Sequence, residues 1–415
     1  MPQLSTSDDA VLVASALAAA LLLLAGVLER RRHAARSAAV PWRISVNGSR
    51  GKSTVARLAT GALAAGGYRP VGKTTGTEAR LIDGETGAET AIVRRPEGPN
   101  IGEQREVTRQ AAARGADALV VECMAVTPEY QDTFHAELLA ANALVITNVL
   151  ADHLEEMGPT TADVAEVLAE GIPRDGLVVV APGPFVPVFR EVAERRGAKL
   201  RVASPEAVDP AVLARFPYLV FPEHVALVLA LCAELGISER AALEGMWQAG
   251  PDPYATRLLP VGDPDDPALF VNAFPANDPA SALGIWEHVV ARGHPADASV
   301  VIMNCRGDRV ARTRQFAEEV LPHLPIGTLV IAGEETQAVR RAVQRGRVAA
   351  GEVLDRTGAD PEAIVDELAP LLAGRVVLGV GNLHGAGRGL IAALEARAAP
   401  APASDAPTSD PEEAT

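Results

Sequence analysis

The chain has 415 residues, a net charge of −15 and 4% aromatic residues. This length is enough for two sizeable cores, whereas the acidic balance and the shortage of aromatic side chains exclude an extended nucleic-acid-binding surface. Three scattered cysteines form no CxxC pair, which is typical of buried thiols in a reducing compartment.

The first predicted element is an apolar helix over residues 10–28. This run carries no charge and would reach about 28 Å as a helix, which is enough to cross a bilayer. Two aspartates precede it and four arginines follow within residues 30–36. This charge bias favours a single-pass anchor in the cell membrane, over residues 1–37, with a cytoplasmic body. The alternative is an apolar helix packed on a soluble body.

The segment over residues 38–248 alternates short apolar strands with helical patterns, which predicts an α/β domain with a mostly parallel sheet. Several strands end in polar residues, as buried parallel strands do when they deliver side chains to a site. The expected strands are 42–46, 118–122, 144–147 and 177–181, and the expected helices are 55–63, 103–114, 161–170 and 222–235.

A cluster of chain breakers at residues 250–253 ends this pattern. The strand pattern then restarts, so residues 249–397 are predicted to form a smaller C-terminal α/β domain. Its expected strands are 269–272, 299–304, 329–332 and 376–380. Residues 398–415 are rich in Pro, Ala, Ser, Asp and Glu without periodicity, which predicts a disordered tail.

The strongest motif lies between the first strand and the first helix of the central domain. It reads Asn47-Gly48-Ser49-Arg50-Gly51-Lys52-Ser53-Thr54. Backbone N–H groups of such a loop bind phosphate, while Lys52 would reach the β and γ oxygens and Ser53 would offer a hydroxyl to Mg²⁺. Val46 stands where the longer GxxxxGK[ST] pattern has glycine, so the short form GxxGK[ST] remains. The loop predicts binding of ATP and Mg²⁺.

The short phosphate loop resembles that of the Mur ligase superfamily, and four later segments extend the likeness. These are Lys73-Thr74-Thr75-Gly76-Thr77, residues 121–126, residues 146–154, and residues 379–385. Together they resemble the ligase subunit of poly-γ-glutamate synthase, the CapB or PgsB family of capsule biosynthesis, over about residues 40–390.

This resemblance implies roles for residues outside the loop. Lys73, Thr75 and Asn382 would bind the nucleotide, and Glu122 and His153 would bind metal. Two of the three lysines in the chain lie in glycine- or threonine-rich turns, where a compact positive charge suits phosphate. The alternative for Lys73 is a solvated loop residue, for Glu122 an acid that caps the next segment, and for His153 a hydrogen-bonded core histidine. Asp152 is expected to orient His153 or its surroundings rather than bind metal directly.

The C-terminal domain offers further candidates. By resemblance, Asn277 and Asp278 lie where this domain faces the nucleotide. Arg306 follows a predicted strand and would bind carboxylates of an anionic polymer, and Arg257, in the linker-like segment, would reach the transferred phosphate on domain closure. Ordinary surface arginines are the alternative.

Three features depart from the superfamily. Its usual N-terminal substrate domain is absent, His224 stands where asparagine is expected near the nucleotide, and no lysine for carbamylation lies between residues 153 and 176. The first and last features favour a polymer ligase over an enzyme of peptidoglycan precursors.

The expected activity is an ADP-forming acid–amino-acid ligase that polymerises glutamate through an acyl phosphate on the side-chain carboxylate. The resemblance implies that glutamate, the growing poly-γ-glutamate chain, the membrane and other membrane subunits of a synthesis and export complex are partners. Self-association into a homo-oligomer is left open. The alternatives are a ligase like folylpolyglutamate synthase and a membrane-tethered P-loop ATPase that acts as a switch.

Overall fold

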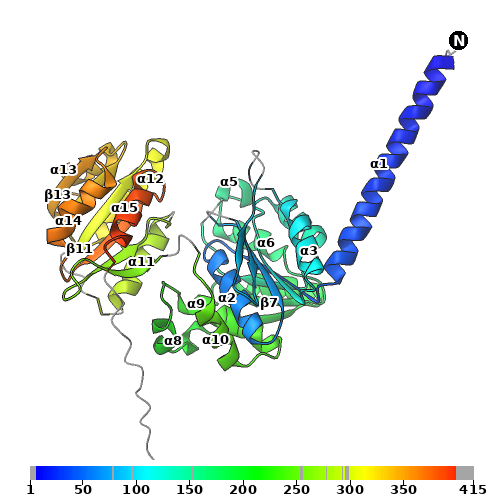
Figure 1. The fold of residues 1–415 in the computed structure, drawn as a ribbon, viewed down its shortest axis with the longest axis horizontal. Helices are drawn as coiled ribbons and strands as arrows, with labels where there is room; N and C mark the ends of the chain where they lie inside the picture. Colours follow the sequence, from blue (N-terminus) through cyan, green and yellow to red (C-terminus); the bar gives the residue numbers. More distant parts are fainter. Residues whose placement is uncertain are drawn as a thin grey trace, which may run out of the picture. The chain divides into compact units, whose positions relative to one another are not determined.

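The computed structural model describes residues 6–76, 79–94, 98, 100–151, 153–252, 256–276, 278–291, 293–294 and 299–398, with side chains from residue 11 onward. The chain divides into two compact units (Figure 1). Unit 1 comprises residues 1–216 and 220–253, and unit 2 comprises residues 217–219 and 254–415. Two sequence-based candidates, Asp152 and Asn277, lie outside the described residues.

Unit 1 is built on a sheet that, within the described ranges, has eight strands in the order β4-β3-β2-β5-β1-β6-β7-β8. Six neighbouring strands run parallel, and β3 and β4 are antiparallel at one edge. The strands are β1 Trp42–Asn47, β2 Pro70–Thr74, β3 Arg80–Asp83, β4 Glu89–Ala91, β5 Ala118–Glu122, β6 Ala143–Ile146, β7 Leu177–Val180 and β8 Lys199–Val202.

Helices cover both faces of this sheet. On one face, α3, α6, α7 and the π-helix η1 pack on apolar side chains of β2, β5, β6 and β7. On the other, α2 and α9 lie against the sheet, and α10 packs on these two helices. The helical segments after α1 are α2 Lys52–Ala65, α3 Glu103–Ala113, α4 Pro128–Asp132, η1 Thr133–Leu139, α5 Leu154–Met157, α6 Thr161–Ala169, α7 Val186–Arg196, η2 Pro205–Ala207, α8 Pro210–Ala214, α9 Pro222–Glu234 and α10 Glu239–Gln248.

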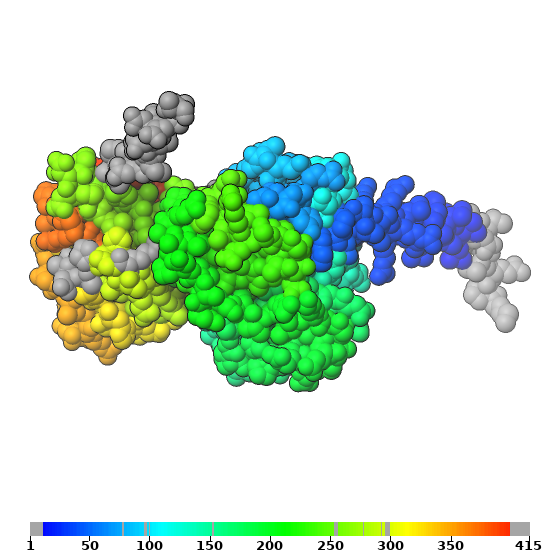
Figure 2. All heavy atoms as spheres, turned by 90° about the horizontal axis from the view of Figure 1, so that it is seen from below, coloured from blue at the N-terminus to red at the C-terminus, as the bar shows by residue number. Residues whose placement is uncertain are grey.

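The helix α1 spans Thr6–Ala38 and is longer than the predicted apolar run at both ends. Residues 11–38 include one candidate membrane span, judged by length and composition, with a mean hydropathy of 2.7 in its most apolar window. The large apolar side chains of residues 11–28 are exposed, unlike those of a helix buried in a soluble body (Figure 2). At its C-terminal end, α1 joins the unit, because His33 and Ser37 are buried.

Unit 2 contains a second sheet, which in the described part of the chain has six strands in the order β13-β12-β11-β14-β10-β9. All neighbours are parallel except β9, which is antiparallel to β10. Its elements are β9 Leu258–Val261, β10 Ala268–Asn272, α11 Pro279–Ala291, β11 Ser299–Cys305, η3 Gly307–Arg309, α12 Val310–Glu319, η4 Leu321–His323, β12 Ile326–Gly333, α13 Gln337–Gln344, β13 Ala350–Thr357, α14 Pro361–Leu368, η5 Ala369–Leu371, β14 Val376–Gly381 and α15 Ala386–Glu395.

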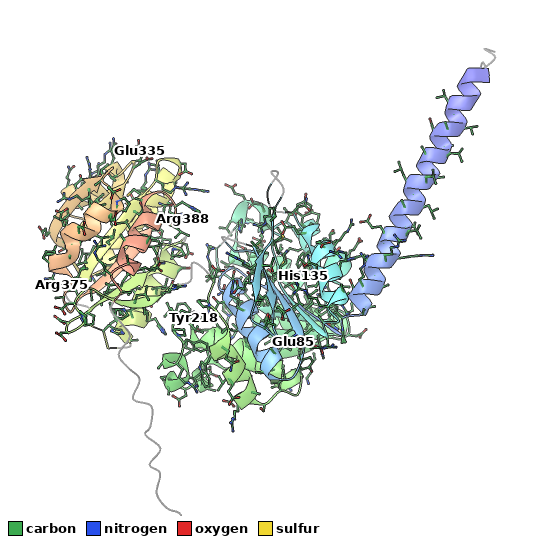
Figure 3. All side chains as sticks on the ribbon, viewed as in Figure 1. Glu85, His135, Tyr218, Glu335, Arg375 and Arg388 are labelled. Atoms are coloured by element: carbon green, nitrogen blue, oxygen red, sulfur yellow. The ribbon has the colours of Figure 1, made fainter. Side chains whose placement is uncertain are left out.

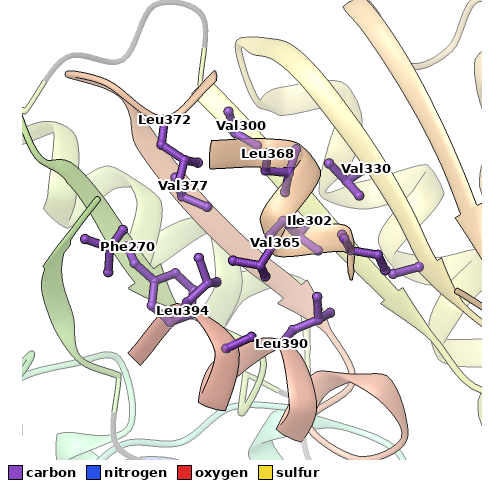
Figure 4. Packing of buried hydrophobic residues seen from close by; sticks show 14 of the residues in the cluster. Phe270, Val300, Ile302, Val330, Val365, Leu368, Leu372, Val377, Leu390 and Leu394 are labelled. Carbon is purple, nitrogen blue, oxygen red and sulfur yellow. The ribbon is translucent and has the colours of Figure 1, made fainter. Parts of the chain in front are cut away.

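The core of unit 2 lies between its sheet and the helices α14 and α15. Leu368 of α14 and Leu390 and Leu394 of α15 pack on Phe270 and Val377 of the central strands (Figure 4). Each such buried side chain contributes about 1.5–3 kcal/mol relative to an exposed one. The two sheets therefore have separate cores.

The fold class predicted from the sequence, a mostly parallel α/β architecture with a smaller second α/β part, is confirmed. The predicted strands are present, with ends that differ by at most three residues. The structure adds β2, β3, β4 and β8 to the first sheet. At the C-terminus, Ala398 forms a bridge with Val261, and residues 399–415 of the predicted tail lie outside the described residues.

Candidate active site

The carboxyl ends of three parallel strands meet at one edge of the first sheet. In the β1–β5 register Val46 is paired with Glu122, and in the β1–β6 register Asn47 is paired with Ile146. The backbone N–H of Cys123 donates to the Val46 carbonyl at 2.8 Å. The loop between β1 and α2 therefore lies beside the segments that follow β5 and β6.

The segment after β6 holds this phosphate loop in place. The backbone N–H of Ser49 donates to the Asn148 carbonyl at 3.1 Å, and the backbone N–H of Arg50 donates to Asn148 Oδ1 at 2.9 Å. Leu150 N–H donates to Ser49 Oγ at 2.9 Å. Asn47 receives a bond from Gly48 N–H at 2.9 Å. These bonds fix the loop before any ligand binds.

Two glycines allow the loop its shape. Gly48 and Gly51 have φ angles of 119° and 80°, which favour glycine. A Cβ atom at Gly48 would lie 2.3 Å from Thr147 Oγ1, and one at Gly51 would lie 2.3 Å from His224 Nε2. The backbone at both positions is thus closely packed, and larger residues do not fit without a shift.

Lys52 and Thr54 lie in the first turn of α2, where backbone N–H groups carry partial positive charge. The Lys52 ammonium donates to the carbonyls of Gly48 at 2.6 Å and Ser49 at 3.0 Å, so it folds back over the loop. A cation above a helix N-terminus is the arrangement that binds phosphate oxygens.

Glu122 forms a cluster with two residues from other segments. Its Oε2 atom accepts a bond from Ser53 Oγ at 2.9 Å and from the backbone N–H of Thr75 at 2.6 Å. Glu122 itself is buried. A hydroxyl and a carboxylate are oxygen ligands of the kind that Mg²⁺ prefers. Within the described ranges no three His, Cys, Asp or Glu side chains converge, so a cation here would also need ligand oxygens such as those of phosphate.

A cavity of about 280 Å³ opens beside this cluster. Its lining contains both polar and apolar side chains. It is lined by Asn47, Gly48, Ser49, Lys52, Thr75, Gly76, Arg94, Cys123, Met124, Ala125, Val126, His153, Met157, Val164 and Leu168. The cavity therefore combines phosphate-binding groups with apolar side chains.

His153 reaches this cavity from the segment after β6. Its φ angle is 51°, and its half-exposed ring lies with Nδ1 3.9 Å from Glu156 Oε2. His153 and Lys52 thus line one cavity, and Glu122 lies behind Thr75, a lining residue whose backbone N–H donates to it. The metal-binding roles of Glu122 and His153 stay predictions. The His153 side chain is half exposed, so it is not the buried core histidine that was the alternative.

Lys73 lies behind the cavity wall and is fully buried, in contrast to the solvated loop lysine that was one alternative. Its Nζ atom is 3.7 Å from Glu103 Oε2 and 3.6 Å from Met124 Sδ. Burial lowers the pKa of Lys73, and the nearby Glu103 carboxylate opposes that change. Lys73 is not part of the cavity lining, so its role in nucleotide binding stays a prediction.

Arg94 is a cavity residue that the sequence did not indicate. Its Nε donates to Glu103 Oε1 at 3.0 Å and its Nη2 to the Thr75 carbonyl at 3.5 Å. Arg94 follows β4 in a segment without regular secondary structure. Its one sequence signal, a pair of adjacent arginines before proline, does not distinguish it from a surface residue.

His224, on α9, packs beneath the phosphate loop. Its ring forms an edge contact with Phe221 at 5.5 Å between centroids. Burial lowers the pKa of His224 to about 4, so the ring is neutral at neutral pH. His224, which stands where the sequence analysis expected asparagine, thus packs directly against Gly51 of the phosphate loop.

A second buried histidine, His135 (Figure 3), forms hydrogen bonds with Ser45 and Gln131 in the core of the unit.

The C-terminal candidates belong to unit 2. Asp278 caps α11, since its carboxylate accepts bonds from Ser281 N at 2.9 Å and Ser281 Oγ at 2.8 Å. Arg306 donates to Asp308 at 2.7 Å, and Arg257 lies 3.7 Å from Glu395. These arginines therefore have carboxylate partners already.

Asn382 is buried where the carboxyl ends of β11 and β14 meet. Its Nδ2 atom donates to the Asn304 carbonyl at 3.2 Å, and its Oδ1 atom accepts from Arg312 at 3.5 Å. Asn304 and Asn382 thus place polar side chains at the carboxyl ends of two neighbouring strands of the second sheet. Binding of nucleotide by Asn382 stays a prediction.

Sequence comparison places these observations in a family. Residues 258–397 match the family described as Poly-gamma-glutamate synthase CapB C-terminal domain. The chain is 46% identical over 366 residues to PGA synthase CapB of Bacillus subtilis (strain 168), covering 88% of this chain and 93% of that protein. It is also 46% identical over 366 residues to the capsule biosynthesis protein CapB of Bacillus anthracis, covering 88% and 79%.

Solved structures share the fold at much lower identity. E. coli FolC in complex with ADP has a TM-score of 0.63 at 17% identity, covering 89% of this chain and 94% of that one. MurF from Acinetobacter baumannii has a TM-score of 0.57 at 14% identity, covering 88% and 78%. These matches confirm the Mur ligase-like fold, and the sequence matches confirm the family inferred above. The chain belongs to the CapB family of poly-γ-glutamate synthases.

Proposed function

We propose that this protein is an ATP-dependent ligase that joins glutamates through the side-chain carboxylate and so makes poly-γ-glutamate for a capsule or exopolymer. The observation that carries the proposal is the cluster of Lys52, Ser53 and Glu122 around a phosphate loop that opens into a half-apolar cavity. Relatives described as PGA synthase and capsule biosynthesis protein support the product.

The same cluster suits a nucleotide and a divalent cation. Fold relatives were solved with ADP, and with AMPPNP and Mn ion. In this chain Ser53 and Glu122 would hold Mg²⁺, with His153 across the cavity as the candidate for a second ion. When bound, Mg²⁺ would neutralise charge on the phosphate oxygens. Lys52 would exchange its loop carbonyls for the β and γ oxygens of ATP.

The first chemical step forms an acyl phosphate. An oxygen of the glutamate side-chain carboxylate attacks the γ-phosphorus of ATP, and the bond from that phosphorus to the bridging oxygen breaks, which releases ADP. Lys52 and the backbone N–H groups of the first turn of α2 stabilise the charge that gathers on the phosphate oxygens. This charge stabilisation is the main contribution of the loop to the rate.

The second step makes the amide. The amine nitrogen of another glutamate attacks the acyl carbon, loses a proton, and expels phosphate, which leaves a γ-amide. An acyl phosphate reacts with water, so exclusion of water matters. Met124, Met157, Val164 and Leu168 supply the apolar wall. We propose that Arg257 and Arg306 add charge stabilisation and carboxylate binding when unit 2 closes.

We also propose that α1 crosses the cell membrane once and keeps both units in the cytoplasm. Support comes from the exposed apolar side chains of residues 11–28 and from the arginines that follow them. The growing polymer must leave the cell to form a capsule, so other membrane subunits are the expected partners.

The test uses membranes that contain the full-length protein, with radiolabelled glutamate and ATP. We expect ADP release that depends on glutamate and labelled polymer of matching amount. Lys52→Ala should abolish both, whereas Lys199→Ala should not, because Lys199 is exposed on β8 and pairs with Glu234 at 2.5 Å. Release of ADP without glutamate would indicate an ATPase switch, and release that needs a folate acceptor would indicate a folylpolyglutamate synthase.

A further inference from the structure

A second hollow lies where α1 meets unit 1, outside the candidate active site. We call it the α1 hollow, and its volume is about 510 Å³. It is lined by Gly26, Glu29, Arg30, His33, Ala34, Ser37, Ala38, Arg43, Arg105, Ala136, Glu137, Leu138 and Ala140. Its lining begins inside the apolar run of α1, at Gly26, and includes Arg43 of β1. Figure 1 shows the end of α1 that joins the unit.

Two buried side chains in this lining each have one polar atom without a hydrogen-bond partner. His33 and Ser37 are 8% and 3% exposed and lie one turn apart on the same face of α1. His33 Nε2 is 2.8 Å from the Leu138 carbonyl, which accepts only, so this nitrogen carries the hydrogen. Within the described residues, His33 Nδ1 and Ser37 Oγ are bonded to nothing. Buried polar groups without partners are costly, so these two atoms indicate a missing ligand. Nδ1, as an acceptor, suits a hydroxyl or ammonium group of that ligand, and the Ser37 hydroxyl can donate to an anionic oxygen.

The charged groups of the hollow favour an anion. The Arg43 guanidinium donates to the carbonyls of Val40 and Ala140, both at 2.6 Å, and none of the described carboxylates forms an ion pair with it. Carbonyl oxygens satisfy its hydrogens but leave its full positive charge. An anion in the hollow would compensate that charge.

Two more arginines line the hollow in exposed ion pairs. Arg30 lies 3.6 Å from Glu137, and Arg105 lies 3.1 Å from Glu29, with all four side chains more than half exposed. Exposed pairs contribute little to stability, so these arginines can exchange carboxylate for phosphate at small cost. Phosphate is also the anion that arginine binds with paired hydrogen bonds.

We propose that the α1 hollow binds the phosphate headgroup of an anionic phospholipid, whose acyl chains lie along the apolar side chains of α1. The proposal rests on the membrane anchor proposed above. A lipid fits better than free phosphate or the polymer, because the hollow starts at Gly26 within the apolar run and so meets both the headgroup and the chain region of a bilayer. Its volume suits a ligand of that size.

The experiment measures lipid retained by the full-length protein after purification in mild detergent, by native mass spectrometry. We expect about one anionic phospholipid per chain. R30Q/R105Q removes two charges from the hollow and should reduce retention about tenfold, since each arginine near an anionic headgroup contributes a factor of several. R31Q/R32Q removes two charges from the same helix outside the hollow and is the matched control. It should retain the lipid.

A third variant separates charge from space. Ala34→Phe keeps every arginine but takes up part of the hollow, and it should also lower lipid retention. Equal loss in R31Q/R32Q, or full retention in both R30Q/R105Q and Ala34→Phe, would overturn the proposal. Displacement of the lipid by inorganic phosphate or by poly-γ-glutamate at low concentration would overturn it in favour of those ligands. Failure of the ligase assay with normal lipid retention would count against the proposed function and leave this site standing.

Discussion

Glu122 joins three segments that are distant in the sequence, because one of its oxygens accepts bonds from Ser53 and from the Thr75 backbone. A carboxylate is needed to hold a cation, whereas either an acid or an amide can accept those two bonds. The charge of Glu122, rather than its packing, is therefore the property that the proposed chemistry requires.

Glu122→Gln should keep the fold and lower kcat/KM for ATP by about 10²–10³, with a higher Mg²⁺ concentration needed for half-maximal rate. Glu244→Gln, on an exposed turn of α10 where the residue pairs with Arg240, is the control and should behave as the wild type. Glutamate-dependent ADP release over a Mg²⁺ series measures both. An unchanged Mg²⁺ requirement in Glu122→Gln would remove Glu122 from the cation site.

Gly51 tests the tight packing of the phosphate loop. Gly51→Ala brings a Cβ to 2.3 Å from His224 Nε2, whereas Gly67→Ala at a similar φ of 89° meets nothing within 4 Å. Both lose about 1–2 kcal/mol from backbone strain, and Gly51→Ala should lose about 1–3 kcal/mol more from overlap. Adding His224→Ala should recover part of that difference. Thermal unfolding measures this, and equal Tm values for the two alanine variants would show that the loop is not closely packed.

At the scale of elements, apolar runs predicted the central strands well. β5, β6 and β7 are buried and consist largely of apolar residues, so their sequence shows them. β1, half of whose residues are polar, was predicted from its place before the glycine loop. β8 reads KLRV and is mostly exposed, and β2 contains Gly72 and the buried Lys73. Neither has the apolar run by which a buried strand is recognised in the sequence.

The residues of the candidate site also divide into those that the sequence marks and those whose positions depend on tertiary contacts. Lys52, Ser53 and Glu122 could be predicted because a local motif or a strand end marks each of them. The position of Arg94 depends on its contacts with Glu103 and Thr75, which are tertiary contacts. Burial of Lys73 beside Glu103 is also a tertiary effect, because charge alone predicts exposure.

The anchor helix carries a prediction about orientation. Arginines at residues 30–36 should keep the C-terminal end of α1 in the cytoplasm and its N-terminal end outside the cell. In inside-out vesicles, added protease should therefore digest both units, whereas in right-side-out vesicles it should spare them. Protection of the units in inside-out vesicles would reverse the proposed orientation.

At the scale of the whole molecule, the positions of the lysines predict that this protein works without a carbamylated lysine. Among the described residues that line the cavity, Lys52 is the one lysine. Lys73 and Lys199 lie near the carboxylates of Glu103 and Glu234. A carbamate next to either carboxylate would add like charge and be disfavoured.

Activity should therefore be unchanged when bicarbonate is stripped at mildly acidic pH, a treatment that removes carbamates. The rate of glutamate-dependent ADP release before and after adding bicarbonate measures this. Activity restored by bicarbonate, or a carbamate mass on Lys73 or Lys199, would mean that a modified lysine takes part.

The central claim is that the glutamate side-chain carboxylate is activated as an acyl phosphate. Glutamate labelled with ¹⁸O in that carboxylate, supplied with ATP to membranes containing the protein, tests it most directly. Because the attacking oxygen leaves with the phosphate, each amide formed should release one phosphate that carries one ¹⁸O atom, as measured by mass spectrometry. Polymer formation with unlabelled phosphate would contradict the mechanism.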